Sequence, residues 1–399
     1  MSTRETGPSP ILNGKMPEIF GRCDPAFQAV ADMFERNLTG RGDASDVGAS
    51  CAVAIDGEVV VDLWGGFADV EKDRVWQEDT LCCCWSVSKT IGAVLTLMMI
   101  DQGKLDLDAP VARYWPAFGT NGKEGVLVRH LLDHTAGVSY VDAELEPGEA
   151  NNWDTMIAAI ESTTLNWPAG SRLGYLNMTQ GYLLGGLCSH VNGGRRLAQF
   201  LREDLAGPLG LDWHFAVADD VMARLATVYQ TDPAMFKRII EKDPDSVFSQ
   251  SMKGRDHNET YNSVQWRKAE NGAGTSHTNA RAMARLYGTL ARGGSLDGVA
   301  VLSRDTLKLA ETQSVRETCA VNGIEMRFSL GFEMNCPPIT PMGPGDRCFG
   351  YIGAGGSFAF ADPDAKIGFG YGHNLMHQGV GPGPCGLPLV EAAIKSVYG

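Results

Sequence analysis

Two β-hairpin patterns, one near each end of the chain, constrain the fold more than any other feature of the sequence. In the stretch SCAVAIDGEVVVDLWGG, two β-rich runs flank Asp56-Gly57, which is a strong hairpin signal. Near the end, SFAFADPDAKIGFGYGHN predicts a second hairpin around Asp362-Pro363-Asp364. The segments between them carry helical patterns broken by Pro and Gly loops. Sheet segments at both ends and none in the middle predict one antiparallel sheet with an inserted, mostly helical part.

Helical patterns flank this sheet in the sequence, so the expected class is α+β. PAFQAVADMFERNL, residues 25–38, has helical periodicity, and LPLVEAAIKSVYG predicts an amphipathic helix at the other end. We expect a discontinuous sheet domain formed by residues 1–85 and 265–399, and a helical domain formed by residues 86–264. A catalytic cleft is expected between them, because pockets favour domain junctions.

Charge and hydropathy limit the partners of the chain. The formal net charge of −14 and the absence of a Lys/Arg-rich block argue against nucleic acid and anionic membranes. The N-terminal residues show no apolar signal region, and the longest apolar run, residues 91–100, is too short to span a bilayer. We therefore expect a cytoplasmic protein with a small-molecule partner; the sequence does not indicate an oligomeric state.

Ten cysteines are many for this length, but their spacing does not indicate a disulfide framework or a metal site. Three of them, Cys82 to Cys84, are adjacent, and no pair has the spacing of metal ligands. Buried free thiols in a reducing compartment are the expectation.

The strongest chemical signal is a serine three residues before a lysine at the start of the most apolar helical pattern. Ser86 is the only serine followed at i+3 by lysine, here Lys89. Positions i and i+3 of a helix lie on one face, so the amine can reach the hydroxyl. The first turn of a helix has unpaired N–H groups that could serve a developing oxyanion. Apolar neighbours would desolvate Lys89 and lower its pKa, which suits proton transfer near neutrality.

A second element, Tyr175-Leu176-Asn177, follows a Pro-Ala-Gly turn. A tyrosine beside a lysine ammonium can be pushed toward phenolate and act as general base and then acid. Asn177 could hydrogen-bond the lysine or a substrate carbonyl.

The order of these motifs resembles that of a known superfamily. Ser86-x-x-Lys89, HLLDHTAG (130–137), PAGSRLGYLN (168–177) and FGYIGAGGSFAFADP (349–363) look like the serine β-lactamase and penicillin-binding-protein superfamily, class C-like branch. Within that branch the sequence most resembles the family VIII carboxylesterases. The resemblance covers nearly the whole chain.

The resemblance implies a role for each matching residue. Ser86 would be the acylated nucleophile, Lys89 its activator, and Tyr175 the general base and acid. The amides of Ser86 and Ala354 would form the oxyanion hole. Asn177, Tyr351, Ile352 and Gly353 would line the substrate site, the last three at the third motif, usually Lys-Thr-Gly. No metal or organic cofactor is implied.

The third motif departs from that pattern, because Tyr351 stands where penicillin-recognising enzymes place a cation. A hydrogen bond to a charged group contributes about 1.5–3 kcal/mol, so an anionic substrate would bind less well. The sequence therefore predicts a serine carboxylesterase that hydrolyses short-chain, mostly neutral esters through an acyl-enzyme. A β-lactamase or D-amino-acid peptidase-type hydrolase, an acyltransferase and a non-catalytic sensor stay open.

Other catalytic routes have weaker support in the sequence. No Gly-x-Ser-x-Gly elbow occurs. His130/His134 and His373/His377 are each four residues apart, but neither pair has the context of a zinc hydrolase. Packing or capping is the expected role of these histidines.

Overall fold

The two predicted hairpins lie side by side in one antiparallel sheet. The computed structural model describes residues 12, 14–40, 44–255, 261–379 and 381–399. Its main sheet has ten strands, nine of them in one path. In spatial order these are β1 (Ile19–Cys23), β3 (Glu58–Asp69), β2 (Gly48–Ile55), β16 (Ile367–His373), β15 (Phe358–Asp362), β14 (Phe349–Ile352), β13 (Glu333–Met334), β12 (Glu325–Phe328) and β11 (Val315–Thr318), with β4 (Arg74–Val75) paired to β3.

Both hairpin predictions are confirmed. Asp56 and Gly57 both have positive φ, as a two-residue turn between twisted strands requires. The second hairpin joins β15 to β16 around residues 363–366. The two hairpins meet where β16 pairs with β2, in register from Ile367 opposite Ile55 to His373 opposite Ala49. The sheet is therefore assembled from the two ends of the chain.

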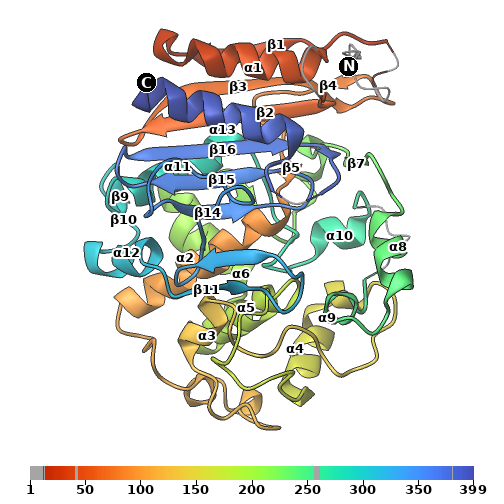
Figure 1. Cartoon of the computed structure of the whole chain (residues 1–399), viewed down its shortest axis with the longest axis vertical. Coiled ribbons are helices and arrows are strands. Elements are labelled where there is room, and N and C mark those ends of the chain that lie inside the picture. The colour runs from red at the N-terminus through yellow and green to blue at the C-terminus, as the bar shows by residue number, and fades with distance from the viewer. Residues whose placement is uncertain (1–11, 13, 41–43, 256–260, 380) are drawn as a thin grey trace.

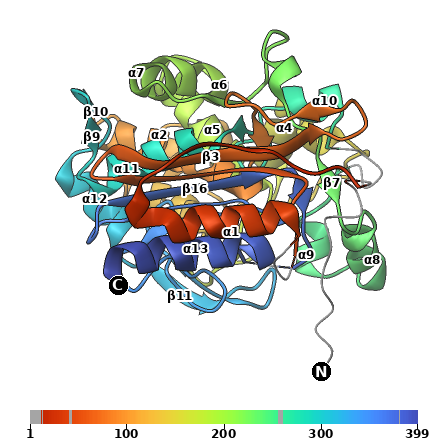
Figure 2. The same ribbon diagram turned by 90° about the horizontal axis from the view of Figure 1, so that it is seen from above.

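Helices cover both faces of the sheet (Figures 1 and 2). The predicted terminal helices, α1 (Gln28–Thr39) and α13 (Gly383–Tyr398), pack against each other on one face. On the other face lies α11 (Ala280–Ala291). At Gly368 a Cβ would lie 2.1 Å from the backbone nitrogen of Gly288, so the glycines of GFGYG allow close helix–sheet packing.

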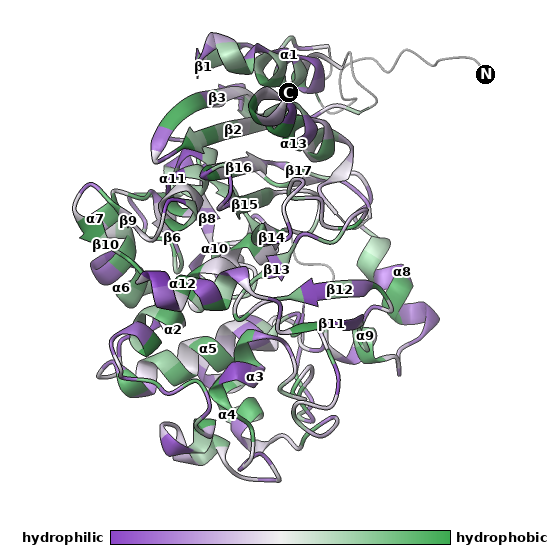
Figure 3. Ribbon diagram, turned by 60° about the vertical axis from the view of Figure 1, so that its left-hand side comes forward, coloured by the Kyte–Doolittle hydropathy of each residue, from purple (hydrophilic) through white to green (hydrophobic). Residues whose placement is uncertain are grey.

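The helical insertion fills the lower half of the molecule (Figure 1). Its longest helices, α2 (Lys89–Asp101) and α5 (Thr179–Val191), pack side by side and are almost entirely buried. Figure 3 shows α5 as largely hydrophobic. The other α-helices of the insertion are α3 (Val128–Leu132), α4 (Trp153–Ser162), α6 (Leu197–Phe200), α7 (Gly207–Leu209), α8 (Met235–Lys242) and α9 (Val247–Gln250). After them come α10 (Val264–Lys268) at its end and α12 (Arg304–Glu311) beyond it.

The expectation that the middle of the chain lacks strands is wrong in detail. The middle of the chain contains β6 (Trp213–His214), which pairs with β8 (His277–Thr278). It also contains β7 (Tyr229–Gln230), which pairs with β17 (Leu375–Met376). Strands of two residues have no periodic signal. The other short strands are β5 (Cys82–Cys83), β9 (Ser295–Leu296) and β10 (Val299–Ala300). The domain boundaries at 85/86 and 264/265 stay predictions.

The cysteine prediction is confirmed in its main point. All ten cysteines are free thiols, and all except the partly exposed Cys23 are buried. In the part of the chain that the structure describes, no helix combines the length and apolarity needed to cross a membrane.

Candidate active site

Ser86 stands on a short 3-10 turn, Trp85–Ser88, that leads directly into α2. Trp85 has φ of +51°, which is rare for a bulky residue and is found mainly where surrounding structure enforces it, often at functional sites. Ser86 is partly exposed, while its neighbours Trp85, Val87 and Ser88 are buried. The turn therefore presents one hydroxyl from an otherwise buried segment.

Lys89 lies directly behind that hydroxyl. Its Nζ is 3.2 Å from Ser86 Oγ and also donates to the carbonyl oxygens of Asn177 at 3.1 Å and Ala273 at 3.0 Å. The side chain is only 1% exposed, and burial lowers the pKa of Lys89 to about 7. A substantial fraction of free amine is therefore present near neutrality, so Lys89 can accept a proton there.

Tyr175 completes a three-residue group. Its side chain lies close enough to Ser86 for the serine to act on its pKa, and its ring centroid is 4.9 Å from Lys89 Nζ. Burial is the largest influence and raises the pKa of Tyr175 well above its usual value. The expectation was that Lys89 would push the phenol toward phenolate, whereas burial favours the neutral phenol. The resting site pairs a neutral phenol with a readily deprotonated lysine.

Glu333, on β13, is a site residue that the sequence reasoning missed. It is 4% exposed, and burial raises the pKa of Glu333 to about 8. The carboxylate and Lys89 act on each other's pKa, and the carboxylate also acts on the pKa of Tyr175. Its Oε2 has no hydrogen-bond partner among the described residues. The available signal was one glutamate inside the apolar run LGFEM.

The end of β14 lies against the turn that carries Ser86. At Gly353 a Cβ would lie 2.6 Å from the carbonyl oxygen of Cys84, so only glycine fits this approach. Ala354 follows at once and packs in the same hydrophobic cluster as Trp85. The two amides expected to form the oxyanion hole, those of Ser86 and Ala354, thus belong to segments in direct contact.

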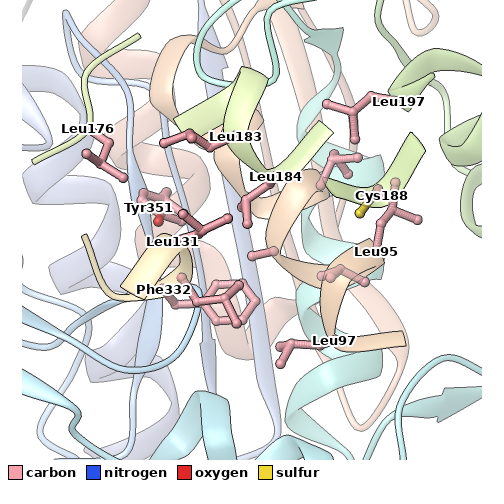
Figure 4. Packing of buried hydrophobic residues seen from close by; sticks show 14 of the residues in the cluster. Leu95, Leu97, Leu131, Leu176, Leu183, Leu184, Cys188, Leu197, Phe332 and Tyr351 are labelled. Atoms are coloured by element: carbon pink, nitrogen blue, oxygen red, sulfur yellow. The ribbon is translucent and has the colours of Figure 1, made fainter. Parts of the chain in front are cut away.

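Tyr351 and Ile352 face the interior instead of an open cleft. The Tyr351 hydroxyl is 3.3 Å from His134 Nε2, and the ring lies among buried apolar side chains, as Figure 4 shows. His134 in turn accepts the Leu176 N–H at 3.0 Å, and its ring centroid is 4.8 Å from that of Tyr175. Tyr351 is therefore linked to the Tyr175 loop through His134, and its substrate role stays a prediction.

Ile352 and Asn177 also differ from the simplest expectation for substrate contacts. Ile352 is 9% exposed and packs in the core beneath α13. The Asn177 side chain donates to Ser251 Oγ at 2.7 Å, so its backbone carbonyl, and not its amide group, holds Lys89.

An aromatic group forms the wall beside Ser86. The Trp85 ring contacts the rings of Tyr261 and Trp266, with centroids 4.5 and 5.7 Å apart. Met376 and Ala354 pack against the same group. The Arg255 guanidinium also packs on the Tyr261 ring at 5.6 Å and donates to the Tyr261 hydroxyl at 2.9 Å, so this wall is aromatic with one cation at its edge.

The two histidine pairs have different surroundings. His130 Nδ1 accepts the Leu127 N–H and caps α3, while His134 bonds elsewhere as described. His373 and His377 both contact Asp46, which no local pattern in the sequence had associated with them.

Comparison with known proteins places this arrangement in a family. The family model described as Beta-lactamase matches residues 34–383. Esterase/beta-lactamase LipL of Mycobacterium tuberculosis is 31% identical over 377 residues, which cover 90% of this chain and 83% of LipL. The crystal structure of a family VIII carboxylesterase has a TM-score of 0.85 and 33% identity, covering 95% of this chain and all of that one. A penicillin-binding-protein homologue from Caulobacter crescentus has a TM-score of 0.84 and 34% identity over 95% of this chain and all of its own.

The fold and these matches define a mixed α/β protein of the penicillin-binding and β-lactamase type, as the motif order predicted. The chain belongs to the Beta-lactamase family and is an esterase/β-lactamase-type serine hydrolase.

Proposed function

We propose that the protein is a carboxylesterase that hydrolyses short-chain, mostly neutral esters through an acyl-enzyme on Ser86. The observation that carries the proposal is the grouping of an amine and a phenol around one hydroxyl. Lys89 Nζ lies 3.2 Å from Ser86 Oγ, the Tyr175 ring lies 4.9 Å from the same amine, and Ser86 acts on the Tyr175 pKa. A nucleophile with an adjacent base and a second proton carrier is what a two-step acyl transfer needs.

In the acylation step the Lys89 amine accepts the Ser86 proton as Oγ bonds to the ester carbonyl carbon. The carbonyl electrons move to oxygen, which the Ser86 and Ala354 amides would stabilise. The intermediate then collapses and the bond to the alcohol oxygen breaks. The neutral Tyr175 hydroxyl donates its proton to that oxygen and regains one from the Lys89 ammonium. In deacylation, water takes the place of the alcohol and the same transfers run in reverse.

Two features support a neutral substrate. Tyr351 supplies no cation at the third motif, and the buried carboxyl of Glu333 lies near Lys89 and Tyr175. A substrate carboxylate would meet no compensating charge from either group. The aromatic wall at Trp85, Tyr261 and Trp266 suits an apolar acyl or alcohol group instead.

β-Lactam hydrolysis is the second candidate, because the relative LipL is named both an esterase and a β-lactamase. The same acyl-enzyme would serve either reaction. Comparing kcat/KM for a short neutral ester and a penicillin separates the two. We expect the ester to be the better substrate, and the reverse result would refute the argument from Tyr351.

Intact-mass measurement after treatment with a fluorophosphonate tests the nucleophile. We expect one adduct on the wild type and none on Ser86→Ala. Ser295→Ala, at an exposed serine on β9 outside the site motifs, is the control and should label fully. Labelling of Ser86→Ala would overturn the assignment. Tyr175→Phe should still bind ester but not turn it over, whereas a wild type that binds without turnover would favour a sensor.

A further inference from the structure

Three potential metal ligands from distant parts of the chain meet outside the active site. Asp46 precedes β2, His373 ends β16, and His377 follows β17. Their exposed fractions are 0%, 5% and 8%. Pairing of β16 with β2 brings Asp46 and His373 together across 327 positions of sequence.

The spacing of the donor atoms fits a small divalent ion. Asp46 Oδ1 lies 3.1 Å from His373 Nδ1 and 3.2 Å from His377 Nε2, and all three atoms lie within 4.8 Å of one another. Ligand atoms about 2.0–2.1 Å from zinc stand roughly 3.3 Å apart along the edge of a tetrahedron. The carboxylate and the two rings thus already stand at about coordination distance from each other.

The second oxygen of the Asp46 carboxylate also has a hydrogen-bond partner. The Tyr371 hydroxyl donates to Asp46 Oδ2, the oxygen that faces away from the histidines. Hydrogen bonds of this kind orient ligating carboxylates in metal sites. The Cys385 thiol, at the start of α13, is 1% exposed and senses the same carboxylate, but its Sγ is not among the three donor atoms that lie within 4.8 Å of one another.

Charge favours a cation at this place. Asp46 is fully buried and carries a negative charge in the folded protein, which favours a cation beside it. Two imidazoles and one carboxylate are a donor set that zinc accepts, with a fourth position left for water.

We propose that Asp46, His373 and His377 form a binding site for one divalent transition-metal ion, with zinc the best fit. On binding, the metal replaces the hydrogen bonds from His373 Nδ1 and His377 Nε2 to Asp46, and each neutral ring then carries its proton on its other nitrogen. This reverses the sequence expectation of no metal, because the spacing of His373 and His377 alone says nothing about Asp46.

The site would hold the loop that carries the proposed oxyanion amide. The His377 N–H donates to the carbonyl oxygen of Gly355 at 3.2 Å, and Gly355 directly follows Ala354. The metal would thus act on catalysis only through the position of this loop, at a distance from Ser86.

The test uses the full chain, stripped with a chelator and titrated with Zn²⁺ or Co²⁺. We expect one equivalent of metal per chain, a higher melting temperature, and the visible absorption bands of protein-bound cobalt. His377→Gln and Asp46→Asn should weaken binding by about 10–100-fold or more. His214→Ala is the control, because His214 pairs with Asp212 at 2.7 Å and lies outside the proposed ligand set.

Three results would overturn the site. The first is a wild type that binds far less than one equivalent of either ion, which needs no variant to fold. The second is equal loss of binding in His214→Ala and His377→Gln. The third is a set of cobalt bands that is unchanged in Asp46→Asn, which would exclude the carboxylate ligand.

Discussion

The protein buries charge in two places and treats it in opposite ways. Around Ser86, Lys89 has no carboxylate within ion-pair distance among the described residues, and burial moves the pKa of both Lys89 and Glu333 toward their neutral forms. Around Asp46, donors surround the carboxylate and hold its pKa well below the usual range. The region around Ser86 stabilises its charges poorly, which suits proton transfer near neutrality. The region around Asp46 stabilises its charge, which suits a structural role.

Replacing Lys89 should give the largest effect and would test the first half of this comparison. We expect Lys89→Met to lower kcat/KM by about 10²–10⁴-fold, because Ser86 loses its proton acceptor. The free energy of unfolding should not fall with it, because the variant relieves the cost of burying an ammonium group. Steady-state kinetics and urea unfolding of the same samples measure both quantities.

Lys123 provides a matched control. It is also a fully buried lysine that donates to backbone carbonyls, those of Glu161 and Thr163, but it lies outside the site. Lys123→Met should keep its activity. Equal loss of activity in both variants would mean that Lys89 acts only through folding.

Replacing Asp46 should give the next largest effect and tests the second half. In metal-free protein we expect Asp46→Asn to lower the free energy of unfolding by about 2–3 kcal/mol, since it weakens hydrogen bonds to a charged group. Because the folded-state pKa of Asp46 lies below 3.8, this stabilisation is present above pH 3.8 and is lost as the pH falls through the folded-state value. The gap between wild type and variant should therefore shrink in acid. A gap that is constant from pH 7 into that range would contradict the charge argument.

Replacing Glu333 should give a smaller effect and tests how its carboxyl group influences the pKa of Lys89. A nearby negative charge favours the ammonium form, so the ionised fraction of Glu333, whose own pKa is raised to about 8, raises the pKa of Lys89 against the lowering effect of burial. The effect is limited by the fraction of Glu333 that is ionised near pH 7. Glu333→Gln should lower the Lys89 pKa further, and the acidic limb of kcat/KM, expected near pH 7 in the wild type, should move to lower pH. A pH–rate profile measures this. If the acidic limb does not move, or moves to higher pH, Glu333 does not raise the pKa of Lys89 as argued.

How far the sequence predicted this molecule depends on the range of the interactions involved. The hairpin at Asp56-Gly57 and the Ser86–Lys89 spacing are local, so they could be read directly from the chain. Tyr175 needed the motif order of a family, because it reaches Ser86 from a separate loop. Glu333 meets Lys89 only because β13 is placed beside β14, and no local pattern encodes that neighbour.

Asp46 and His134 show the same limit. Asp46 meets His373 through strand pairing between the two ends of the chain, and His134 meets Tyr351 across the junction of helices and sheet. The sequence analysis assigned Tyr351 to the strand of the third motif, and the structure has it on β14. The direction of its side chain could not be read from the sequence. The catalytic and substrate-binding roles assigned to these residues stay predictions until the variants are measured.

Tyr351→Phe should give the smallest effect and decides between the two accounts of the third motif. If the hydroxyl only bonds His134, its loss should lower the free energy of unfolding by about 1 kcal/mol. Turnover of a neutral ester should change little, because the Leu176 N–H still holds His134 and the Tyr175 loop. If instead KM for the ester rises strongly at unchanged stability, the Tyr351 hydroxyl contacts substrate directly. The buried position seen here would then belong to the resting site, and the third motif would have to open when ester binds.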